Sequence, residues 1–524
     1  MRIQPPHGKR KIGNQTERLT LRKKHCQAIC TSFFQTKKME IIEKPHHVVV
    51  HPFPAQGHIK PMLCLAQLLS EAGLYITFII THHIHKRLAD YLPSLTARFP
   101  NLHFQSISDG FPDDHPRKVN SDYFNEMKIK TKPHFKQAVV SLGLESSDNR
   151  SSRLRPAVSC IIADGYLVYS FDVAEELTLP IFTFVSHGAC FLQAYYCIPT
   201  LIQQGHLPFP DDDMNHEIKC VIGLEGLLRR KNLPSVCMLR EVESPVFQSA
   251  VNDILGMNRS SGVIINTFDE LEVECLPHVA THFHKVYTVG PLHEFLNSRI
   301  GNFGIQSHAS LWKAEQNCLP WLDSQPLKSV LYVSFGTLTK RSISQLLEIW
   351  HGLVNSGHPF LWVIHSDVVL DEERENVMPE ELQKGAKENG YIVDWAPQEE
   401  VLVHNSVGGF LTHCGWNSML ESLMARIPLI CWPHSNDQNL NTEFVTKVLR
   451  IGVELEASDR STVEATVRTL MGSQREEFQR SVDKIAKCAQ DGIGHGGSSN
   501  HNLEMLVRDI KMMQLKSQEH HRKA

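Results

Sequence analysis

The sequence lacks several features that mark particular classes of protein. Its 524 residues contain no apolar run of 18 or more, so no membrane-spanning helix is predicted. The 13 cysteines include no CxxC pair and no spacing typical of a disulfide framework, which favours a reducing compartment, the cytoplasm. No cluster has metal-ligand spacing, so we expect no metal. The net charge is only −4, and we expect a monomer without a nucleic-acid partner.

Acidic residues are nearly missing from the start of the chain. The first 38 positions hold ten Lys or Arg against one acid, Glu17, and no apolar core of a secretory signal. This composition is typical of a transit peptide, of a disordered extension, or of residues upstream of a start codon at Met39. We expect residues 1–44 to be a basic, disordered extension.

Short β-branched runs alternate with helical patterns through the rest of the chain. This order predicts βαβ units with right-handed crossovers and parallel sheets. The predicted strands lie at 46–53, 75–81, 159–165, 181–186, 262–268 and 285–291, and then at 329–337, 359–365, 391–397, 408–413 and 429–433. The predicted helices lie at 55–74, 172–180, 344–357, from about 417, and at about 501–515.

We therefore expect an α/β fold with two Rossmann-like, doubly wound domains that face each other across a cleft. The first domain spans 45–291, a polar, glycine-containing linker spans 292–310, and the second domain spans 311–500. Residues 501–524 form a helix and tail, and the sequence leaves open whether they return to the first domain. Ligands bind at the carboxyl ends of strands in such sheets, so the cleft is the expected site.

The segment GGFLTHCGWNS places His413 at a strand end, with Gly415 and a helix start directly after it. Unpaired N–H groups and the helix dipole favour an anion at such a place, and a diphosphate suits it. His413, Asn417 and Ser418 add side-chain donors there, and Thr337 in the turn SFGT offers another. A plain βα loop explains the same glycines, so this segment alone leaves both interpretations open.

Four further side chains suit a nucleotide sugar. Trp395 ends a strand and can stack on a base, although core packing is the usual role of such a tryptophan. Glu421 shares a helix face with the donors before it and can accept the hydroxyls of a ribose, or it is a solvated helix glutamate. Asp437 and Gln438 offer acceptors and donors to sugar hydroxyls, or they form an ordinary polar turn.

A candidate base lies in the first half. His58 follows the first strand at the carboxyl edge of the sheet, and Asp164 ends another strand of that half. If the two strands are neighbours, the carboxylate can orient the imidazole and stabilise its protonated form, as in hydrolase triads. The chain has 30 histidines, so only the position of His58 distinguishes it from a structural one.

The stretch from Trp395 to Gln438 resembles the signature of plant family 1 UDP-sugar-dependent glycosyltransferases, and the similarity extends from about residue 45 to 512. The resemblance implies the fold called GT-B, with His58 as the catalytic base and Asp164 as its activating aspartate. It implies a donor site in which Trp395 stacks on uracil and Gln398 lies beside it, Glu421 binds the ribose, and Trp416, Asp437 and Gln438 face the sugar. His413, Asn417 and Ser418 then hold the diphosphate, and Thr337 and Ala396 belong to the same site.

By this resemblance the reaction is a single in-line displacement that gives a β-glucoside from UDP-glucose, without a metal or other cofactor. A final glutamine, here Gln438, usually goes with UDP-glucose. Segments such as SISDGFPDDHPR resemble the branch with 7-deoxyloganetic acid glucosyltransferases, which implies an iridoid or other small terpenoid acceptor. Candidates for an apolar acceptor pocket are Phe53, Phe111, His187, Cys190 and Phe191. Two departures from the signature, at 426–428 and 434–436, bear on the loop beside the sugar.

Two other functions remain open at this point. A nicotinamide-dependent oxidoreductase is one, because GIGHGG at 492–497 has the form GxGxxG. It follows a polar helical stretch rather than a strand, so we interpret it as a helix end and a loop, with Ser499 or Asn500 capping the next helix. A non-catalytic binder of a nucleotide or small molecule is the other, although it would not need His58 and Asp164 beside a sugar site.

Overall fold

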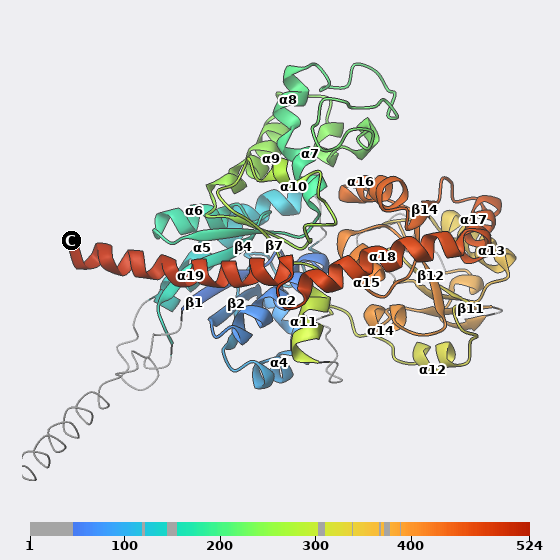
Figure 1. Cartoon of the computed structure of the whole chain (residues 1–524), viewed down its shortest axis with the longest axis horizontal. Helices are drawn as coiled ribbons and strands as arrows, with labels where there is room; N and C mark the ends of the chain where they lie inside the picture. Colours follow the sequence, from blue (N-terminus) through green and yellow to red (C-terminus); the bar gives the residue numbers. More distant parts are fainter. Residues whose placement is uncertain are drawn as a thin grey trace, which may run out of the picture. The chain divides into compact units, whose positions relative to one another are not determined.

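The computed structural model describes residues 46–117, 121–143, 155–301, 310–337, 339–365, 368–370, 378–387 and 389–523 (Figure 1). The predicted basic extension, 1–44, lies outside the described residues. The described residues form two parallel-stranded halves, as the alternation of strand and helix patterns predicts.

The first half contains a seven-stranded sheet in the order β3-β2-β1-β4-β5-β6-β7, and all its pairs are parallel. Its strands are β1 (His47–His51), β2 (Tyr75–Thr81), β3 (Leu102–Ile107), β4 (Val158–Asp164), β5 (Ile181–Val185), β6 (Val263–Ile265) and β7 (Val286–Thr288). The central strands are buried along their whole length because helices cover both faces, which explains their continuous apolar runs.

The second half contains another seven-stranded sheet, in the order β10-β11-β9-β8-β12-β13-β14. Only β10 runs antiparallel to its neighbour; the other pairs are parallel. The strands are β8 (Val330–Ser334), β9 (Phe360–Val363), β10 (Gly385–Lys387), β11 (Gly390–Val393), β12 (Val407–Thr412), β13 (Leu429–Cys431) and β14 (Gly452–Glu454).

Each sheet has the strand order of a doubly wound fold, which confirms the predicted class. In the first sheet the order of connection reverses between β1 and β4, and in the second between β8 and β12. The loops after such a pair of strands lead to opposite faces and leave a crevice at the carboxyl edge. The residues after β1, β4, β8 and β12 are therefore the ones expected to meet a ligand.

Helices cover both sheets. Those of the first half are α2 (Gln56–Glu71), α3 (His82–Leu88), α4 (Leu92–Arg98), α5 (Ser121–Gly143), α6 (Tyr169–Glu176), α7 (Ala189–Tyr196), α8 (Ile198–Gln203), α9 (Pro245–Leu255), α10 (Leu276–Val279) and α11 (Leu292–Ile300). The later ones are α12 (Cys318–Asp323), α13 (Ile343–Ser356), α14 (Gln398–Leu402), α15 (Trp416–Met424), α16 (Asp437–Glu443), α17 (Arg460–Arg468), α18 (Arg475–Ile493) and α19 (Ser498–Lys523).

The segment predicted as a linker begins with a helix instead. Residues 292–300 form α11, whose Leu292, Phe295 and Leu296 are buried in the same apolar cluster as helix α2. The polar residues between these positions gave the segment the composition of a linker. Residues 302–309 of the predicted linker lie outside the described residues, and the domain boundary stays a prediction.

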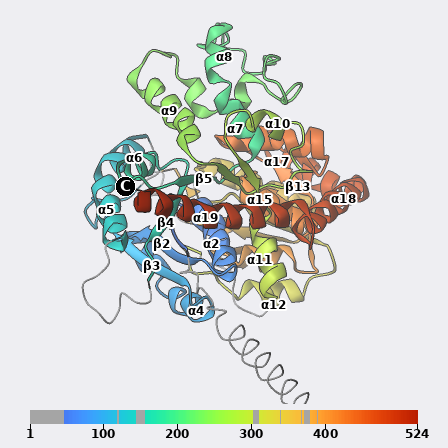
Figure 2. The same ribbon diagram turned by 60° about the vertical axis from the view of Figure 1, so that its left-hand side comes forward.

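Helix α19 starts at Ser498, before the predicted position, and packs against the first half (Figures 1 and 2). Leu506 and Ile510 are buried in the apolar cluster of the first sheet. Asp509 binds the ammonium of Lys285 and the hydroxyl of Tyr287, each at 2.6 Å. The last helix therefore ties the end of the second half to strand β7.

The GIGHGG segment comprises the last two residues of α18 and the loop that leads to α19, so it follows a helix and not the strand that a dinucleotide-binding loop requires. The predicted cap was wrong, because both Ser499 and Asn500 lie within helix α19. The hydroxyl of Ser499 donates instead to the carbonyl oxygen of Gly290, at 2.7 Å.

Candidate active site

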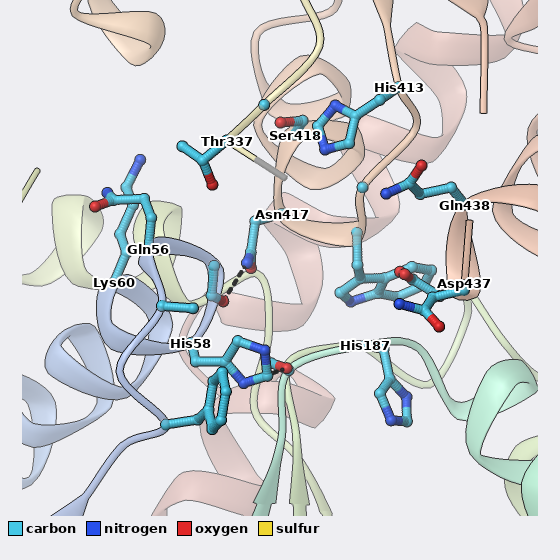
Figure 3. A pocket seen from close by; sticks show the side chains of 18 of the residues that line it. Gln56, His58, Lys60, His187, Thr337, His413, Asn417, Ser418, Asp437 and Gln438 are labelled. Atoms are coloured by element: carbon cyan, nitrogen blue, oxygen red, sulfur yellow. Dashed lines mark hydrogen bonds between the residues drawn. The ribbon is translucent and has the colours of Figure 1, made fainter. Parts of the chain in front are cut away.

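A cavity of about 600 Å³ is lined by residues from the carboxyl edges of both sheets (Figure 3). His58 lines it from the first half. The predicted donor residues line it from the second half: Thr337, Trp395, Ala396, Gln398, His413, Trp416, Asn417, Ser418, Glu421, Asp437 and Gln438. Its volume is in the usual range for small-molecule sites. The two strand-reversal points thus contribute to one shared cavity.

His58 and Asp164 meet because their strands are neighbours. Strand β4 pairs with β1, so Asp164 at the end of β4 lies under the first turn of α2, which carries His58. The imidazole Nδ1 lies 2.7 Å from Asp164 Oδ2 and 3.0 Å from the hydroxyl of Ser186. Asp164 is only 1% exposed, and its other oxygen accepts from the backbone N–H of Tyr166. With the Nδ1 proton held by the carboxylate, Nε2 is the nitrogen left to accept a proton.

Aromatic rings surround this histidine. The ring of Phe53 lies 5.0 Å from the imidazole and that of Tyr166 lies 5.5 Å away, both measured between centroids. Phe124 stacks on Phe53 at 4.9 Å. His187 also lines the cavity, and burial lowers its pKa to about 4, so it is neutral at pH 7. The surroundings of His58 are therefore mainly apolar.

Three predicted acceptor-pocket residues were wrong. Phe111, Cys190 and Phe191 are buried in the apolar core and do not line the cavity, whereas Phe53 and His187 do. Sequence position placed all five near strand ends, but it does not show which side of a helix or loop faces the cavity. Residues from α5 and α9 line the cavity instead: Phe124, Asn125, Lys128, Val246, Ala250, Asp253 and Ile254.

Two glycines make room for His413. Gly336 follows β8 with a φ of +69°, and Gly415 precedes helix α15. A Cβ atom on Gly336 would lie 2.7 Å from the imidazole of His413, and one on Gly415 would lie 2.5 Å from it. Burial lowers the pKa of His413 to about 4, so its ring is a neutral hydrogen-bond donor at pH 7. Side chains at either glycine would displace this donor.

The helix start at α15 is linked to the first half. Gly415 at the N-cap offers no side-chain cap. Asn417 in the first turn donates to the carbonyl of Gly57 at 2.6 Å and accepts from Asn266 at 3.2 Å (Figure 3). The indole of Trp416 donates to the backbone oxygen of Asn266 at 2.8 Å. The helix start that favours an anion is therefore held directly against the first turn of α2, which carries His58.

Glu421 binds two partners within the cavity. Its Oε1 accepts from the ammonium of Lys60 and its Oε2 from the amide of Gln398, each at 2.7 Å. Lys60 also pairs with Glu399. Burial disfavours the charge of Lys60, but the two glutamates outweigh burial and raise its pKa. A ribose at Glu421 would share this carboxylate with Lys60, a residue that the sequence alone did not single out.

A second tryptophan supports Trp395. The rings of Trp312 and Trp395 stack with centroids 4.9 Å apart and an interplanar angle of 28°. Trp395 lines the cavity and Trp312 does not, so Trp312 lies behind it. The guanidinium of Arg87, from the first half, lies 5.2 Å from the ring of Trp312. Trp395 is therefore held in place as an aromatic surface of the cavity and is not buried in the core.

The side of the cavity predicted for the sugar is built by Asp437 and Gln438. Burial raises the pKa of Asp437 to about 6, although a hydrogen bond from Asn441 favours its charged form. The side-chain oxygen of Gln438 accepts from the backbone N–H groups of His434 and Ser435, at 2.8 and 3.2 Å. Gln438 thus shapes the loop in which the sequence departs from the family signature.

The sequence predicts neither a metal site nor a membrane span. Within the described part of the chain, no group of three or more His, Cys, Asp or Glu side chains is arranged to hold a metal ion. None of the described helices combines the length and the apolar character needed to cross a bilayer.

Comparison with known proteins identifies relatives of this chain. Residues 302–485 match the family model for UDP-glucoronosyl and UDP-glucosyl transferases. The chain is 42% identical over 477 residues to a 7-deoxyloganetic acid glucosyl transferase of Catharanthus roseus, which covers 90% of this chain and 98% of the relative. It is also 42% identical over 458 residues to mogroside I-A1 synthase of Siraitia grosvenorii, with 86% of each covered.

Solved structures agree with this relationship. Medicago truncatula UGT71G1 complexed with UDP-glucose superposes with a TM-score of 0.73 at 26% identity, covering 90% of this chain and all of that one. Os79 from O. sativa in complex with UDP gives a TM-score of 0.72 at 26% identity, covering 88% of this chain and all of that one. Two doubly wound halves suit a dinucleotide as well, but helix α18 rather than a strand precedes GIGHGG, and the relatives are glycosyltransferases, so an oxidoreductase is not supported. This chain belongs to the plant family 1 UDP-glycosyltransferases, enzymes of the GT-B fold that use a UDP-sugar donor.

Proposed function

We propose that this enzyme transfers glucose from UDP-glucose to a hydroxyl or carboxyl of a small, mainly apolar terpenoid, with iridoids as the first candidates, and that the product is a β-glucoside. One observation carries the proposal. His58, which Asp164 binds at 2.7 Å, lines the same cavity as the helix start at Gly415 and the donor-type side chains of the second half. Base and nucleotide site therefore share one space.

In this proposal His58 takes the proton of the acceptor hydroxyl through Nε2, and Asp164 stabilises the imidazolium that forms. The oxygen attacks the anomeric carbon from the face opposite UDP, the bond to the diphosphate breaks, and the configuration inverts. The charge that develops on the leaving diphosphate is met by His413, the α15 helix start, Thr337 and Ser418. No metal takes part in these steps.

The remaining donor contacts follow from the walls of the cavity. Trp395, supported by Trp312, stacks on uracil, and Ala396 and Gln398 lie beside the base. Glu421 binds the ribose hydroxyls, as a carboxylate on a helix face does in other nucleotide sites. Trp416, Asn417, Asp437 and Gln438 surround the diphosphate and the sugar. Glucose is supported by the names of the relatives and by the UDP-glucose bound to UGT71G1.

A mass-spectrometric screen of acceptors with UDP-glucose tests the proposal, beginning with iridoid acids and phenolics. UDP-galactose and UDP-glucuronic acid serve as matched donors. The expected result is a glucoside whose anomeric proton has the coupling of a β linkage, with little product from the other donors. Calorimetric binding of UDP-glucose without turnover on any acceptor would instead favour a non-catalytic binder.

We further infer a cytoplasmic monomer. All eleven described cysteines are free thiols, as expected in a reducing compartment. Light scattering behind size-exclusion chromatography tests the monomer, and fractionation of plant cells tests the compartment.

A further inference from the structure

The part of the cavity wall that helices α5 and α9 contribute contains an ion pair. Lys128 from α5 and Asp253 from α9 both line the cavity, and the ammonium binds the carboxylate directly. The Lys128 side chain is 17% exposed and that of Asp253 is 25% exposed. The other lining residues of α9, Val246, Ala250 and Ile254, are apolar, and α5 adds Phe124 and one polar residue, Asn125. Salt bridges of surface side chains are usually solvated, whereas this pair lies in a mainly apolar, partly buried wall.

Aromatic rings connect this pair with the proposed base. The ammonium of Lys128 lies 6.0 Å from the ring centroid of Phe124, one helical turn earlier on α5. Phe124 stacks on Phe53 at 4.9 Å, and Phe53 lies 5.0 Å from His58. An acceptor whose hydroxyl reaches His58 therefore lies along these rings, and its far end points toward Lys128.

Lys128 is the ammonium available to an acceptor. Among the described residues that line the cavity, the only lysines are Lys60 and Lys128, and none is an arginine. Lys60 pairs with Glu399 and Glu421 beside the donor residues. An ammonium has three donors, and Asp253 does not use all of them. In a partly buried apolar wall, a second carboxylate gains strong charge-assisted hydrogen bonds.

We propose that Lys128 binds a carboxylate at the far end of the acceptor, away from the hydroxyl that receives glucose. Asp253 competes for the same ammonium and so limits the preference for acids. This inference rests on the proposed function, because it assigns a substrate class to the same cavity. Lys128 is then a specificity-determining residue: it favours hydroxy acids over their neutral esters.

The test compares each acid with its methyl ester. The probes are 7-deoxyloganetic acid and p-coumaric acid, which differ in the separation of hydroxyl and carboxylate, and only the glucoside of the hydroxyl is counted. Lys128→Met keeps the apolar stem and removes the ammonium. It should lower kcat/KM for at least one acid by roughly ten- to a hundredfold and leave that ester within about twofold, the range of a hydrogen bond to a charged group.

Asp253→Asn is expected to act in the opposite direction. It removes the competing carboxylate and should raise kcat/KM for the same acid several-fold without a change for the ester. Lys132→Met is the matched control: it lies one turn later on α5, pairs with Asp172 and Glu176, and does not line the cavity. Lys132→Met should leave kcat/KM unchanged for both the acid and the ester.

Equal losses for acid and ester in Lys128→Met would show that the pair only joins α5 to α9 and would overturn the proposal. A lower kcat/KM for the acid in Asp253→Asn would do the same. If the wild-type enzyme glucosylates no acceptor, the proposed function fails. In that case calorimetry in the presence of UDP still tests whether Lys128 binds a carboxylate. It compares the binding of acid and ester to the wild type and to Lys128→Met. If the wild type binds acid and ester with equal affinity, the carboxylate site is refuted.

Discussion

Replacing Asp164 by asparagine isolates the electrostatic role of the proposed activating residue. Asp164 is 1% exposed, accepts from Nδ1 of His58 at 2.7 Å and accepts from the N–H of Tyr166 at 3.1 Å. Asparagine has nearly the same shape, so the space and the backbone contact persist. What disappears is the negative charge that faces the imidazolium formed when His58 takes a proton.

The size of the effect follows from the short contact. Two unit charges whose centres are about 4 Å apart interact by about 4 kcal/mol at an effective dielectric constant of 20. At about 1.4 kcal/mol for each factor of ten, losing this interaction lowers kcat about a thousandfold. The amide can also turn its NH₂ toward Nδ1, which would hold the wrong tautomer and deepen the loss.

The assay is initial UDP release with an acceptor hydroxyl and saturating UDP-glucose, together with the KM for UDP-glucose. We expect kcat to fall while that KM stays within about twofold, because Asp164 binds His58 and the backbone of Tyr166 and does not itself line the cavity. Asp509→Asn is the matched control, since Asp509, on helix α19, is a mostly buried acid that binds Lys285 and Tyr287. If Asp164→Asn kept kcat within tenfold of wild type and unfolded at the same temperature, His58 would not depend on its charge, and the mechanism would be wrong.

Three further changes test other parts of the site. Gly415→Ala places a Cβ atom 2.5 Å from the His413 ring and should raise the KM for UDP-glucose at least about tenfold. Gly472→Ala is the control, because its Cβ atom would have nothing within 4 Å, and it should leave this KM unchanged. Equal KM values in the two variants would contradict the steric argument. His58→Ala should abolish transfer to hydroxyls yet spare ester formation on carboxylates, which are already ionised at pH 7, and an equal loss on both would refute the role of His58 as base. Burial raises the pKa of Asp437 from 3.8 to about 6, so the folded protein keeps a proton there that the unfolded chain releases, and stability falls as pH rises from about 4 to 6. Asp437→Asn should therefore raise the unfolding free energy by about 3 kcal/mol at pH 7 but not at pH 3.5, and it should weaken UDP-glucose binding. Thermal unfolding at the two pH values measures the change in stability. An equal gain in stability at both pH values would contradict the raised pKa of Asp437.

Local patterns were enough to predict much of the fold and of the site. Strand β1 is a β-branched run that stops at a proline, and β4 ends at Asp164, so both strand ends were predictable from a few neighbouring residues. Parallel pairing then brings the two carboxyl ends to one edge, and His58 meets Asp164. The GGFLTHCGWNS turn was predictable in the same way, because its glycines and helix start are adjacent in the chain.

The residues that were missed depend on partners far away in the sequence. Lys60 lies on an otherwise mostly buried apolar helix, and Glu421, which binds it, is 361 positions later. Trp312 supports the site only through its stacking on Trp395, which is 83 positions later in the sequence. Strand β3, with its edge position and four partly exposed residues in a row, lacks the continuous apolar run of the central strands. None of these features leaves a periodic signal in the sequence.

Donor binding and base placement are joined by direct contacts between the two halves. Asn417, at the helix start proposed for the diphosphate, donates to the carbonyl of Gly57, the residue directly before His58. Trp416 and Asn417 both bind Asn266, which belongs to the loop after strand β6. Substitution of Asn417 therefore removes both a side chain of the proposed diphosphate site and a hydrogen bond to the peptide that precedes the base. Substitutions of Asn417 should consequently change kcat and the KM for UDP-glucose together. Substitution of Asp164, which binds the base and does not line the cavity, should change kcat alone.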